Sequence, residues 1–399
     1  MKVALLSDCY PPRVGGIESQ VSDLAARLVG AGHEVEVFTA TTGPKGECRG
    51  AVEAVAVDGG LVRVHRLAEP LLGGLPVNPF AVGEMRRRLA SGGFDVAHVH
   101  VGVVSPFAWD AARVATGLGL PTALTWHCVL DRAGVVYRAS GVLRRWVERG
   151  AVLSAVSSFA ARQAAAAAPA GTEVAVLPNA IDLDAWRPRE RPLPLRRWGD
   201  HNTYGAVGAV PGGAVARAKG EEVRLVSTMR LAPRKRPVEL VEAFAAAGVA
   251  DRARLEIIGD GPLRGRVAQR VVDLNLTGRV VLRGRVERSE LRESYARAHG
   301  YLAPTRLEAF GIAVLEARAA GLPVVAMAGS GVDDIVEHEV DGLLVPDDTA
   351  LTAAIRRVVD DVDWRGRVAE HNRSVPPPQT WDAVLADVEA EYRRAQEAR

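Results

Sequence analysis

The chain has 399 residues, which exceeds the size of one ordinary domain and predicts two domains of average size. Hydrophobic residues make up 48% of the sequence and charged residues 25%, a composition typical of globular proteins with material for two cores. The formal net charge is only +2, which argues against a protein whose main partner is nucleic acid.

Three cysteines, Cys9, Cys48 and Cys128, are widely spaced and match no metal-binding pattern. Their odd number favours a reducing compartment and no structural disulfide. The apolar run at the start of the chain is shorter than a signal peptide requires, and no run approaches the roughly 18 apolar residues of a membrane span. We therefore expect a cytoplasmic protein, at most peripheral to a membrane at its inner face.

The first half of the chain alternates short β-branched segments with longer amphipathic ones. This pattern predicts a parallel sheet covered by helices on both faces. Strands are predicted, in chain order, at 3–7, 34–39, 62–67, 95–100, 122–127, 153–157 and 174–178. Helices are predicted at 17–29 and 78–90, among others.

Residues 187–222 are rich in Pro, Gly and Arg and have little periodicity, which predicts an inter-domain linker with a partly disordered insertion. Strand and helix patterns then resume. Strands are predicted at 223–229, 255–258, 280–282, 301–303, 324–326 and 343–345, with helices at 237–247 and 311–320 and a last helix at 381–394. The sequence thus predicts two doubly wound α/β domains, 1–186 and 223–378, followed by a terminal helical segment, 379–399.

Ligands of open α/β sheets bind beyond the carboxyl ends of the strands, so two facing domains are expected to enclose a cleft. After the first strand, Gly15 and Gly16 precede a helix, where the backbone can approach an anion closely. The pattern is not GxGxxG, which disfavours a dehydrogenase, and a tight turn without function is the alternative. His127 ends another strand, where an imidazole can bond a sugar hydroxyl or a developing charge. A structural histidine is the alternative there.

Basic residues follow the strand predicted at 223–229. Arg230, Arg234, Lys235 and Arg236 lie between that strand and a helix. The position suits a diphosphate, because Arg offers a planar fork and Lys a point charge. Lys is rare in this Arg-rich chain, which favours a specific need at position 235; a solvated basic turn is the alternative.

The segment 304–316 runs from the end of a strand into a helix and holds Glu308 and Glu316. A glycosidase pair would hold its carboxyl groups about 5–9.5 Å apart. If all steps between these glutamates were helical, the rise would be about 12 Å and the faces would differ by roughly 80°. A hydrolytic pair is disfavoured. We expect the two side chains to contact different parts of one ligand, with phosphate at the helix N-terminus between them; two ordinary surface glutamates are the alternative.

This segment reads Glu308-Ala-Phe-Gly-Ile-Ala-Val-Leu-Glu316 and resembles the Glu–any seven–Glu signature of retaining GT-B glycosyltransferases of family 4. Phosphatidylinositol mannosyltransferases and GPI N-acetylglucosaminyltransferases are members of this kind. Further motifs of the family follow the same order along nearly the whole chain: Gly15-Gly16, His127, 178–182, Arg230 with Lys235, 258–262, 320–325, 341–345 and a helix opening at Trp381. The resemblance implies an α/β fold of two facing Rossmann-like domains with a cleft between them. It also implies a C-terminal helix that crosses back to the N-terminal domain.

The resemblance implies roles for individual residues. Arg230 and Lys235 would neutralise the donor diphosphate, Glu308 would bind sugar hydroxyls, and His127 would lie beside the sugar; these four form the expected catalytic set. Glu316 would bind the ribose. The other expected donor-binding residues are Gly15, Gly16, Gly259, Asp260, Phe310, Gly311, Ile312 and Ala313, and Tyr10 and Arg13 are expected on the acceptor side.

The implied reaction moves a hexose from GDP-mannose or a UDP-hexose such as UDP-GlcNAc to a hydroxyl acceptor, on one face of the sugar. The leaving phosphate helps to deprotonate the acceptor, so no protein nucleophile, metal ion or other cofactor is expected. Some members that act on phosphatidylinositol carry a basic helix where this chain has Arg86, Arg87 and Arg88. A lipid or inositol-type acceptor and a peripheral membrane contact are therefore expected, with a solvated basic face as the alternative.

The chain departs from the family pattern at 330–334, which reads Ser-Gly-Val-Asp-Asp where many members have Gly-Gly-x-x-Glu. The resemblance therefore assigns no contact from this loop to the donor sugar. Other functions on the same fold stay open. An epimerase would change the donor without an acceptor, a phosphorylase would need pyridoxal phosphate on one of only four lysines, and a nucleotide-sugar binder would lack catalysis. The intact Glu308, Lys235 and His127 disfavour the binder.

Overall fold

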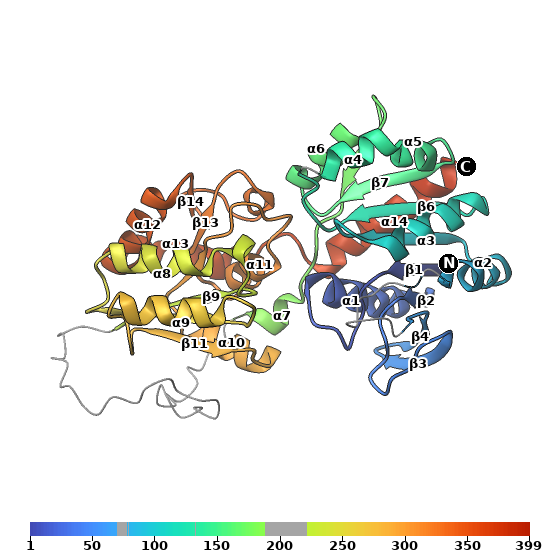
Figure 1. The fold of residues 1–399 in the computed structure, drawn as a ribbon. Helices are drawn as coiled ribbons and strands as arrows, with labels where there is room; N and C mark the ends of the chain where they lie inside the picture. The colour runs from blue at the N-terminus through green and yellow to red at the C-terminus, as the bar shows by residue number, and fades with distance from the viewer. Residues whose placement is uncertain (70–77, 79, 132, 188–221) are drawn as a thin grey trace.

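The computed structural model describes residues 1–69, 78, 80–131, 133–187 and 222–399. Within these residues the chain forms two α/β units side by side, each built around one sheet (Figure 1). The insertion predicted at 187–222 falls almost entirely on residues 188–221, which lie outside the described residues.

The N-terminal sheet has the strand order β3-β4-β2-β1-β5-β6-β7-β8. Its strands are β1 (Lys2–Ser7), β2 (Glu34–Thr39), β3 (Ala51–Val57), β4 (Gly60–Arg66), β5 (Val96–Val101), β6 (Thr122–Trp126), β7 (Ala151–Ala155) and β8 (Val174–Val176). Every neighbouring pair is parallel except β3 and β4, which form an antiparallel hairpin. The prediction of a parallel sheet is wrong at this edge. The strand β3 was not predicted, because a partly exposed edge hairpin replaces the usual crossover helix there.

Helices cover both faces of this sheet. Alternate side chains of β1 point to opposite faces and therefore pack into two different cores. Val3 and Leu5 pack with α1 (Gly16–Gly30), whereas Ala4 and Leu6 pack with α2 (Ala81–Ser91) and α3 (Pro106–Gly117). The remaining helices of the first half are α4 (Ala133–Ser140), α5 (Val142–Val147), α6 (Ser158–Ala167) and the short α7 (Leu183–Trp186).

The C-terminal sheet is wholly parallel, in the order β11-β10-β9-β12-β13-β14. Its strands are β9 (Val223–Thr228), β10 (Ala253–Ile258), β11 (Val280–Gly284), β12 (Gly300–Ala303), β13 (Val324–Met327) and β14 (Gly342–Val345). Its helices are α8 (Pro237–Ala246), α9 (Arg264–Asp273), α10 (Arg288–Arg297), α11 (Ile312–Ala319), α12 (Asp348–Asp360) and α13 (Val362–Ser374). In both sheets the strand order reverses beside the first strand, between β1 and β5 and between β9 and β12. Such reversals leave a crevice at the carboxyl ends of the strands, where ligands bind.

The last helix, α14 (Trp381–Glu397), returns to the N-terminal unit, as predicted (Figure 1). Its N-terminus is capped by Thr380, whose hydroxyl accepts a hydrogen bond from the amide of Ala383 at 3.3 Å. Trp381, Val388 and Tyr392 are buried in the same core as α1 and β1. The two halves are therefore tied together by a helix that belongs in sequence to the second half and in packing to the first.

Candidate active site

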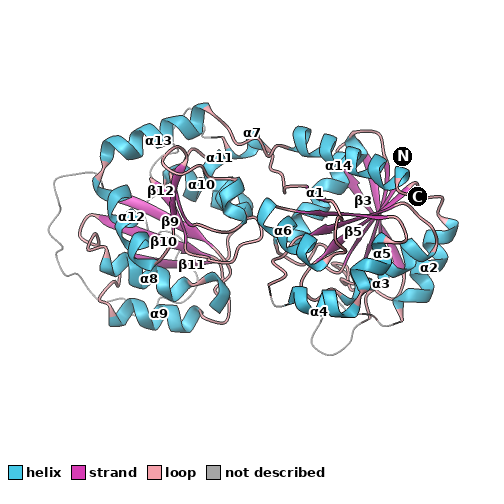
Figure 2. Cartoon of the chain, turned by 90° about the horizontal axis from the view of Figure 1, so that it is seen from above, coloured by secondary structure: helices cyan, strands magenta, loops and turns pink. Residues whose placement is uncertain are grey.

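Loops that follow strands of the two sheets contact each other where the two units meet. Ser157, just after β7, donates a hydrogen bond to the carbonyl of Ala309, beyond β12, at 2.5 Å. A Cβ atom placed on Gly16 would lie 4.0 Å from the side chain of Ile312. Figure 2 shows α1 and α6 on the side of the N-terminal unit that faces the C-terminal unit. The glycine turn and the loop after β12 therefore oppose each other, as the sequence predicts for a ligand cleft.

The loop between β12 and α11 is held in a defined shape. Gly311 has φ +99°, a conformation that side chains rarely adopt, and it lies at the N-terminus of α11. Gly331 packs so closely that a Cβ atom there would collide with the carbonyl of Ala309. Phe310 is 2% exposed and anchors the loop in the core. These contacts fix the start of α11, and the first N–H groups of a helix can bind an anion.

Lys235 and Glu308 form an ion pair across this loop. Their side chains remain 32% and 20% exposed, so both reach the cleft. Arg234 donates two hydrogen bonds to the carbonyl of Leu307, at 3.2 and 3.0 Å, which joins the basic turn to the carboxylate loop. Arg230 is exposed at the end of β9. The structure thus brings Lys235 and Glu308 together, whereas the side chain of Arg230 makes no described contact with either of them.

Glu316 lies on α11, has a different partner and is 8% exposed. Burial raises the pKa of its carboxyl group to about 7, against the opposing effect of the positive charges of Arg288 and Arg292. The guanidinium of Arg288 lies 3.8 Å from Glu316 and 3.6 Å from Asp23 on α1, in the other unit. The two glutamates therefore have separate electrostatic environments, in agreement with the expectation that they do not form an acid–base pair.

The glycine turn lies at the start of α1, which begins at Gly16. A Cβ atom on Gly15 would collide with the side chain of Glu18, which is bound to Arg13 at 3.1 Å. Arg13 is exposed, as an acceptor-side residue requires. Tyr10 is different, because it is only 3% exposed and its ring lies under the guanidinium of Arg66. In this conformation Tyr10 offers little surface to an acceptor.

Gly259 and Asp260 follow β10 and pack against the basic turn. Gly259 has φ +126°, and a Cβ atom there would collide with the carbonyl of Met229, the residue before Arg230. The amide of Leu231 donates a hydrogen bond to the carbonyl of Asp260 at 2.9 Å. These contacts position the segment that carries Arg230, so the backbone of Gly259 and Asp260 supports the site from beneath.

His127 lies directly after β6, with its amide bound to the carbonyl of Val101 at 3.0 Å. Burial lowers the pKa of its imidazole to about 4, so the ring is neutral at pH 7. Its Nε2 atom lies 2.9 Å from Nδ1 of His100, a buried residue of β5. The side chain of Asn179 lies close enough to raise the pKa of His127, against the effect of burial. No hydrogen bond of full geometry joins the two residues.

Sequence reasoning missed several residues that shape this cleft. His98 and His100 sit two positions apart on β5 and lie behind His127. Their spacing, with one apolar residue between them, was a signal that both would face one side of a strand. Asp334 was missed as a contact: its carboxylate accepts hydrogen bonds from the amide and hydroxyl of Ser158, both at 2.6 Å. Only the three-dimensional pairing of the units reveals this contact.

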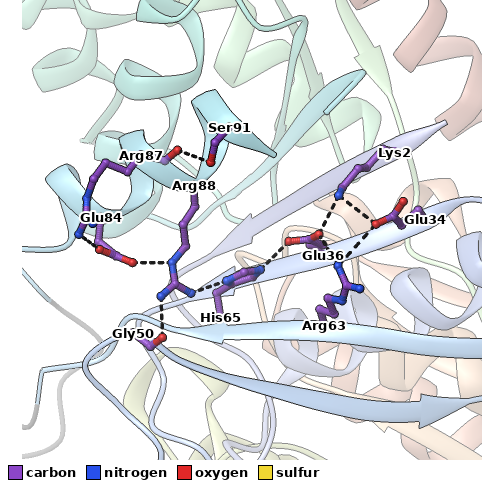
Figure 3. Close-up of polar contacts among 10 residues, drawn as sticks. All are labelled: Lys2, Glu34, Glu36, Gly50, Arg63, His65, Glu84, Arg87, Arg88 and Ser91. Atoms are coloured by element: carbon purple, nitrogen blue, oxygen red, sulfur yellow. Dashed lines mark hydrogen bonds and ion pairs between the residues drawn. The ribbon is translucent and has the colours of Figure 1, made fainter. Parts of the chain in front are cut away.

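Of the three consecutive arginines on α2, Arg86 to Arg88, not all are free to contact a membrane. Arg88 donates to Nδ1 of His65 at 2.5 Å and to the carbonyl of Gly50 at 2.7 Å, and it also binds Glu84 (Figure 3). Arg87 forms an ion pair with Glu84 but keeps a side chain that is 77% exposed. Arg86 is exposed. Arg88 therefore holds the β3–β4 hairpin to α2, and Arg86 and Arg87 are the members that face solvent.

Neither a metal-binding cluster nor a membrane-spanning helix is present among the residues that the structure describes. No group of three or more His, Cys, Asp or Glu side chains there is arranged to hold a metal ion. Among the helices of the described ranges, none is both long and apolar enough to cross a membrane.

Comparisons with known proteins identify the class of protein to which this fold belongs. Residues 14–185 match the model for Glycosyltransferase Family 4, and residues 214–375 match the model for Glycosyl transferases group 1. Among solved structures, sucrose-phosphate synthase from Thermosynechococcus elongatus superposes with a TM-score of 0.71 at 22% identity, with all of both chains covered. Anabaena HepE, in complex with UDP and glucose, gives a TM-score of 0.69 at 18% identity, covering 98% of this chain and 99% of HepE. The fold is that of the GT-B glycosyltransferases.

Curated relatives align over the full length. A GDP-mannose-dependent alpha-(1-6)-phosphatidylinositol monomannoside mannosyltransferase of Mycobacterium tuberculosis is 28% identical, covering 100% of this chain and 99% of the relative. A D-inositol 3-phosphate glycosyltransferase of Jonesia denitrificans is 29% identical, covering 96% and 92%. The two matched models together span most of the chain. The protein belongs to the family 4 glycosyltransferases.

Proposed function

We propose that this glycosyltransferase moves a hexose from a nucleotide-diphosphate sugar to a hydroxyl acceptor with retention of configuration. The observation that carries the proposal is the ion pair between Lys235 and Glu308, opposite the glycine turn at Gly16. A nucleotide sugar can bind both members of this ion pair, each through a different group. The diphosphate is the partner for Lys235 and Arg230, and the sugar hydroxyls are the partners for Glu308.

The proposed reaction occurs on one face of the sugar. The bond between the anomeric carbon and the diphosphate oxygen breaks as the acceptor oxygen forms its bond to the same carbon. The acceptor proton passes to an oxygen of the leaving diphosphate, whose added charge is stabilised by Arg230, Lys235 and the N-terminus of α11. A neutral imidazole with a pKa of about 4 is a weak base, so we assign no proton transfer to His127. Because cations stabilise the leaving group, we propose transfer without a metal ion, which activity in EDTA would support.

The donor and acceptor follow from the relatives and remain part of the proposal. The Mycobacterium tuberculosis relative is GDP-mannose-dependent and acts on a phosphatidylinositol monomannoside, and the Jonesia denitrificans relative is named for D-inositol 3-phosphate. We therefore propose GDP-mannose as the donor to test first, with UDP-hexoses next. An inositol-bearing molecule, free or lipid-linked, is the proposed acceptor.

A lipid-linked acceptor would bring the N-terminal unit to an anionic membrane, at the inner face of the cell membrane. Val135 and Val136 on α4 are 69% and 68% exposed, and Arg144 and Arg145 on α5 are exposed beside them in sequence. Exposed apolar side chains near cations suit a lipid surface. Flotation with anionic vesicles tests this contact; equal recovery of the wild type and a Val135→Ser, Val136→Ser variant would exclude this surface.

The function is tested by measuring sugar transfer with paired variants. Lys235→Met and Glu308→Gln are each expected to lower kcat/KM at least about 100-fold, because each removes a charge that acts on the reacting part of the donor. Arg266→Met is the matched control, since it removes an exposed cation from α9 in the same unit and should leave transfer unchanged. Normal turnover in both site variants would contradict the proposal.

Two outcomes would favour the alternatives. A changed donor in the absence of any acceptor would identify an epimerase. A nucleotide sugar that raises the melting temperature without transfer to any acceptor in the panel would favour a binding protein. A thermal-shift panel of GDP, UDP, ADP and their sugars precedes both assays and selects the donor.

A further inference from the structure

A line of buried polar side chains runs from the cleft into the N-terminal core. His98 and His100 lie on the same face of β5, because alternate residues of a strand share a face. They are 1% and 3% exposed, and their rings lie in contact with centroids 4.1 Å apart and planes tilted by 35°. His100 contacts His127 at the cleft, and His98 contacts Tyr392 of α14, with its Nδ1 atom 3.0 Å from the hydroxyl. The C-terminal helix is thereby linked to the strand-end histidine.

The proton positions at the inner end of this line follow from counting donors and acceptors. Ser154 donates to the carbonyl of Leu124 at 3.2 Å, so its oxygen accepts from Thr125 at 2.7 Å. Thr125 then accepts from Nε2 of His98 at 2.7 Å. Nδ1 of His98 is left without a proton and accepts from Tyr392. His98, Thr125 and Ser154 each donate once and accept once along this line, so His98 is held neutral with its proton on Nε2.

The outer end of the line has two possible proton arrangements. Two neutral imidazoles joined through Nδ1 of His100 and Nε2 of His127 must place one proton between them. If His127 donates, the proton of His100 lies on Nε2, which is buried and has no hydrogen-bond partner in the part of the chain that the structure describes. If His100 donates, the proton of His127 lies on Nδ1, which is also buried without a hydrogen bond of full geometry but has the side chain of Asn179 beside it in the same small cavity. Only this second arrangement gives the buried N–H a polar neighbour that can accept its proton, so it is favoured.

We propose that His100 is a positioning residue for His127, donating from Nδ1 to hold the neighbouring ring neutral with its proton on Nδ1. His98 and Tyr392 support it from beneath, through the contact between the two tilted imidazole rings and the hydrogen bond from His98 to α14. The proposal rests on the proposed function in one respect, because His127 is the residue assigned beside the transferred sugar. It goes further by giving the C-terminal helix a part in shaping the cleft.

The test combines a proton-sensitive measurement with kinetics. Long-range nitrogen–proton NMR of histidine-labelled protein reports which ring nitrogen of each histidine carries the proton. In the wild type, His127 is expected to carry it on Nδ1 and His98 on Nε2. In His100→Phe, the signal of His127 is expected to change to a mixture of both forms, and kcat to fall about tenfold, as for the loss of one neutral hydrogen bond. The donor KM should change much less than kcat.

Two further variants separate positioning from simple loss of structure. In His100→Asn the side-chain amide can donate from close to the position of Nδ1, so both the proton state of His127 and kcat should be largely restored. Tyr392→Phe removes only the hydroxyl and is expected to alter the His98 signal with a smaller effect on kcat than His100→Phe. His338→Asn, at an exposed histidine of the C-terminal unit, is the control for labelling and assignment.

Two results would overturn the proposal. One is a wild-type His127 that carries its proton on Nε2; the other is a His100→Phe protein whose His127 signal and kcat both match the wild type. A wild type that transfers no sugar at all would instead contradict the proposed function, and the NMR result would still decide the proton arrangement.

Discussion

In both halves of the molecule the strand order reverses beside the first strand, but the halves place opposite kinds of chemistry at their strand ends. The C-terminal half presents formal charges there, with Arg230, Lys235 and Glu308 at the cleft and Glu316 behind them. The N-terminal half presents a glycine turn and the neutral His127, supported by other neutral histidines. Because a nucleotide sugar carries its charge in the diphosphate, we propose that the C-terminal half binds the donor. In the N-terminal half the formal charges at the glycine turn, Arg13 and Glu18, are paired with each other.

This division also gives the halves opposite responses to pH. The pKa of His98 is lowered to about 3 and that of His127 to about 4, and that of His100 lies well below its ordinary value, all through burial. The free energy of unfolding therefore falls as the pH drops below about 6.5, the pKa of histidine in the unfolded chain. Below that pH the unfolded chain binds more protons than the folded protein does. Glu316 has the opposite sign, since its folded pKa of about 7 exceeds its unfolded value.

The largest expected effect is therefore a selective loss of stability in acid. Between pH 8 and pH 5 each buried histidine contributes a loss of up to about 2 kcal/mol. Burial raises the pKa of Asp8 to about 6. Its protonation in the folded protein therefore offsets about 1 kcal/mol of this loss in the same half. With three such histidines the N-terminal unit should thus lose up to about 5 kcal/mol, whereas protonation of Glu316 should stabilise the C-terminal unit. Hydrogen exchange, corrected for its intrinsic pH dependence, would measure this in peptides of β5 and α11.

The control for this experiment is His338→Gln, which removes an exposed histidine and should leave both responses unchanged. Equal changes of protection in the two units would break the comparison, because they would show that the histidines are protonated in the folded protein or that the units unfold only together.

The next largest effect concerns Glu316 alone. In Glu316→Gln the side chain keeps its size but cannot ionise, so the variant should be more stable than the wild type at pH 8, by up to about 3 kcal/mol, and nearly equal at pH 5. Between these values the wild type loses stability as the pH rises from the unfolded pKa of about 4.5 to the folded pKa of about 7. The same change should weaken nucleotide binding about tenfold if the carboxylate accepts ribose hydroxyls. Denaturant unfolding and calorimetry would measure the two effects.

Glu256→Gln is the matched control, because Glu256 is a glutamate of β10 that is only 3% exposed and lies outside the cleft. Its pKa is also raised by burial, so its stability should respond with the same sign, whereas nucleotide affinity should not change. A Glu316→Gln protein that binds nucleotide as tightly as the wild type would remove Glu316 from the donor site.

Part of the C-terminal half of the candidate site could be predicted from local patterns, because Glu308 and Glu316 lie on one strand–loop–helix segment. Lys235 follows the neighbouring strand β9, 73 residues before Glu308, and it was joined to that segment by the family resemblance. All the predicted strands of both sheets are present, with boundaries that differ by a few residues. The edge strand β3 was missed because its hairpin lacks the crossover pattern on which the prediction depended.

The N-terminal half could not be predicted to the same depth. His100 meets His127 through the pairing of β5 with β6, and His98 meets Tyr392 across almost the whole chain. Tyr10 was expected at the acceptor side but is buried by Arg66, a contact between β4 and the loop after β1. Contacts of this kind depend on how separate segments pack, and one sequence contains no local signal for them.

The smallest expected effect tests how far the two halves are independent. Asp334 of the C-terminal unit accepts hydrogen bonds at the N-terminus of α6, where the helix dipole favours a negative charge. A double-mutant cycle with Ser158→Ala and Asp334→Ala should give a coupling energy of about 1 kcal/mol in unfolding. The exposed pair of Arg373 and Glu370 on α13 is the control cycle, for which less than about 0.5 kcal/mol is expected. A coupling no larger than this control would mean that the contact does not hold the units together, and the opposite pH responses should then appear as two separate unfolding transitions.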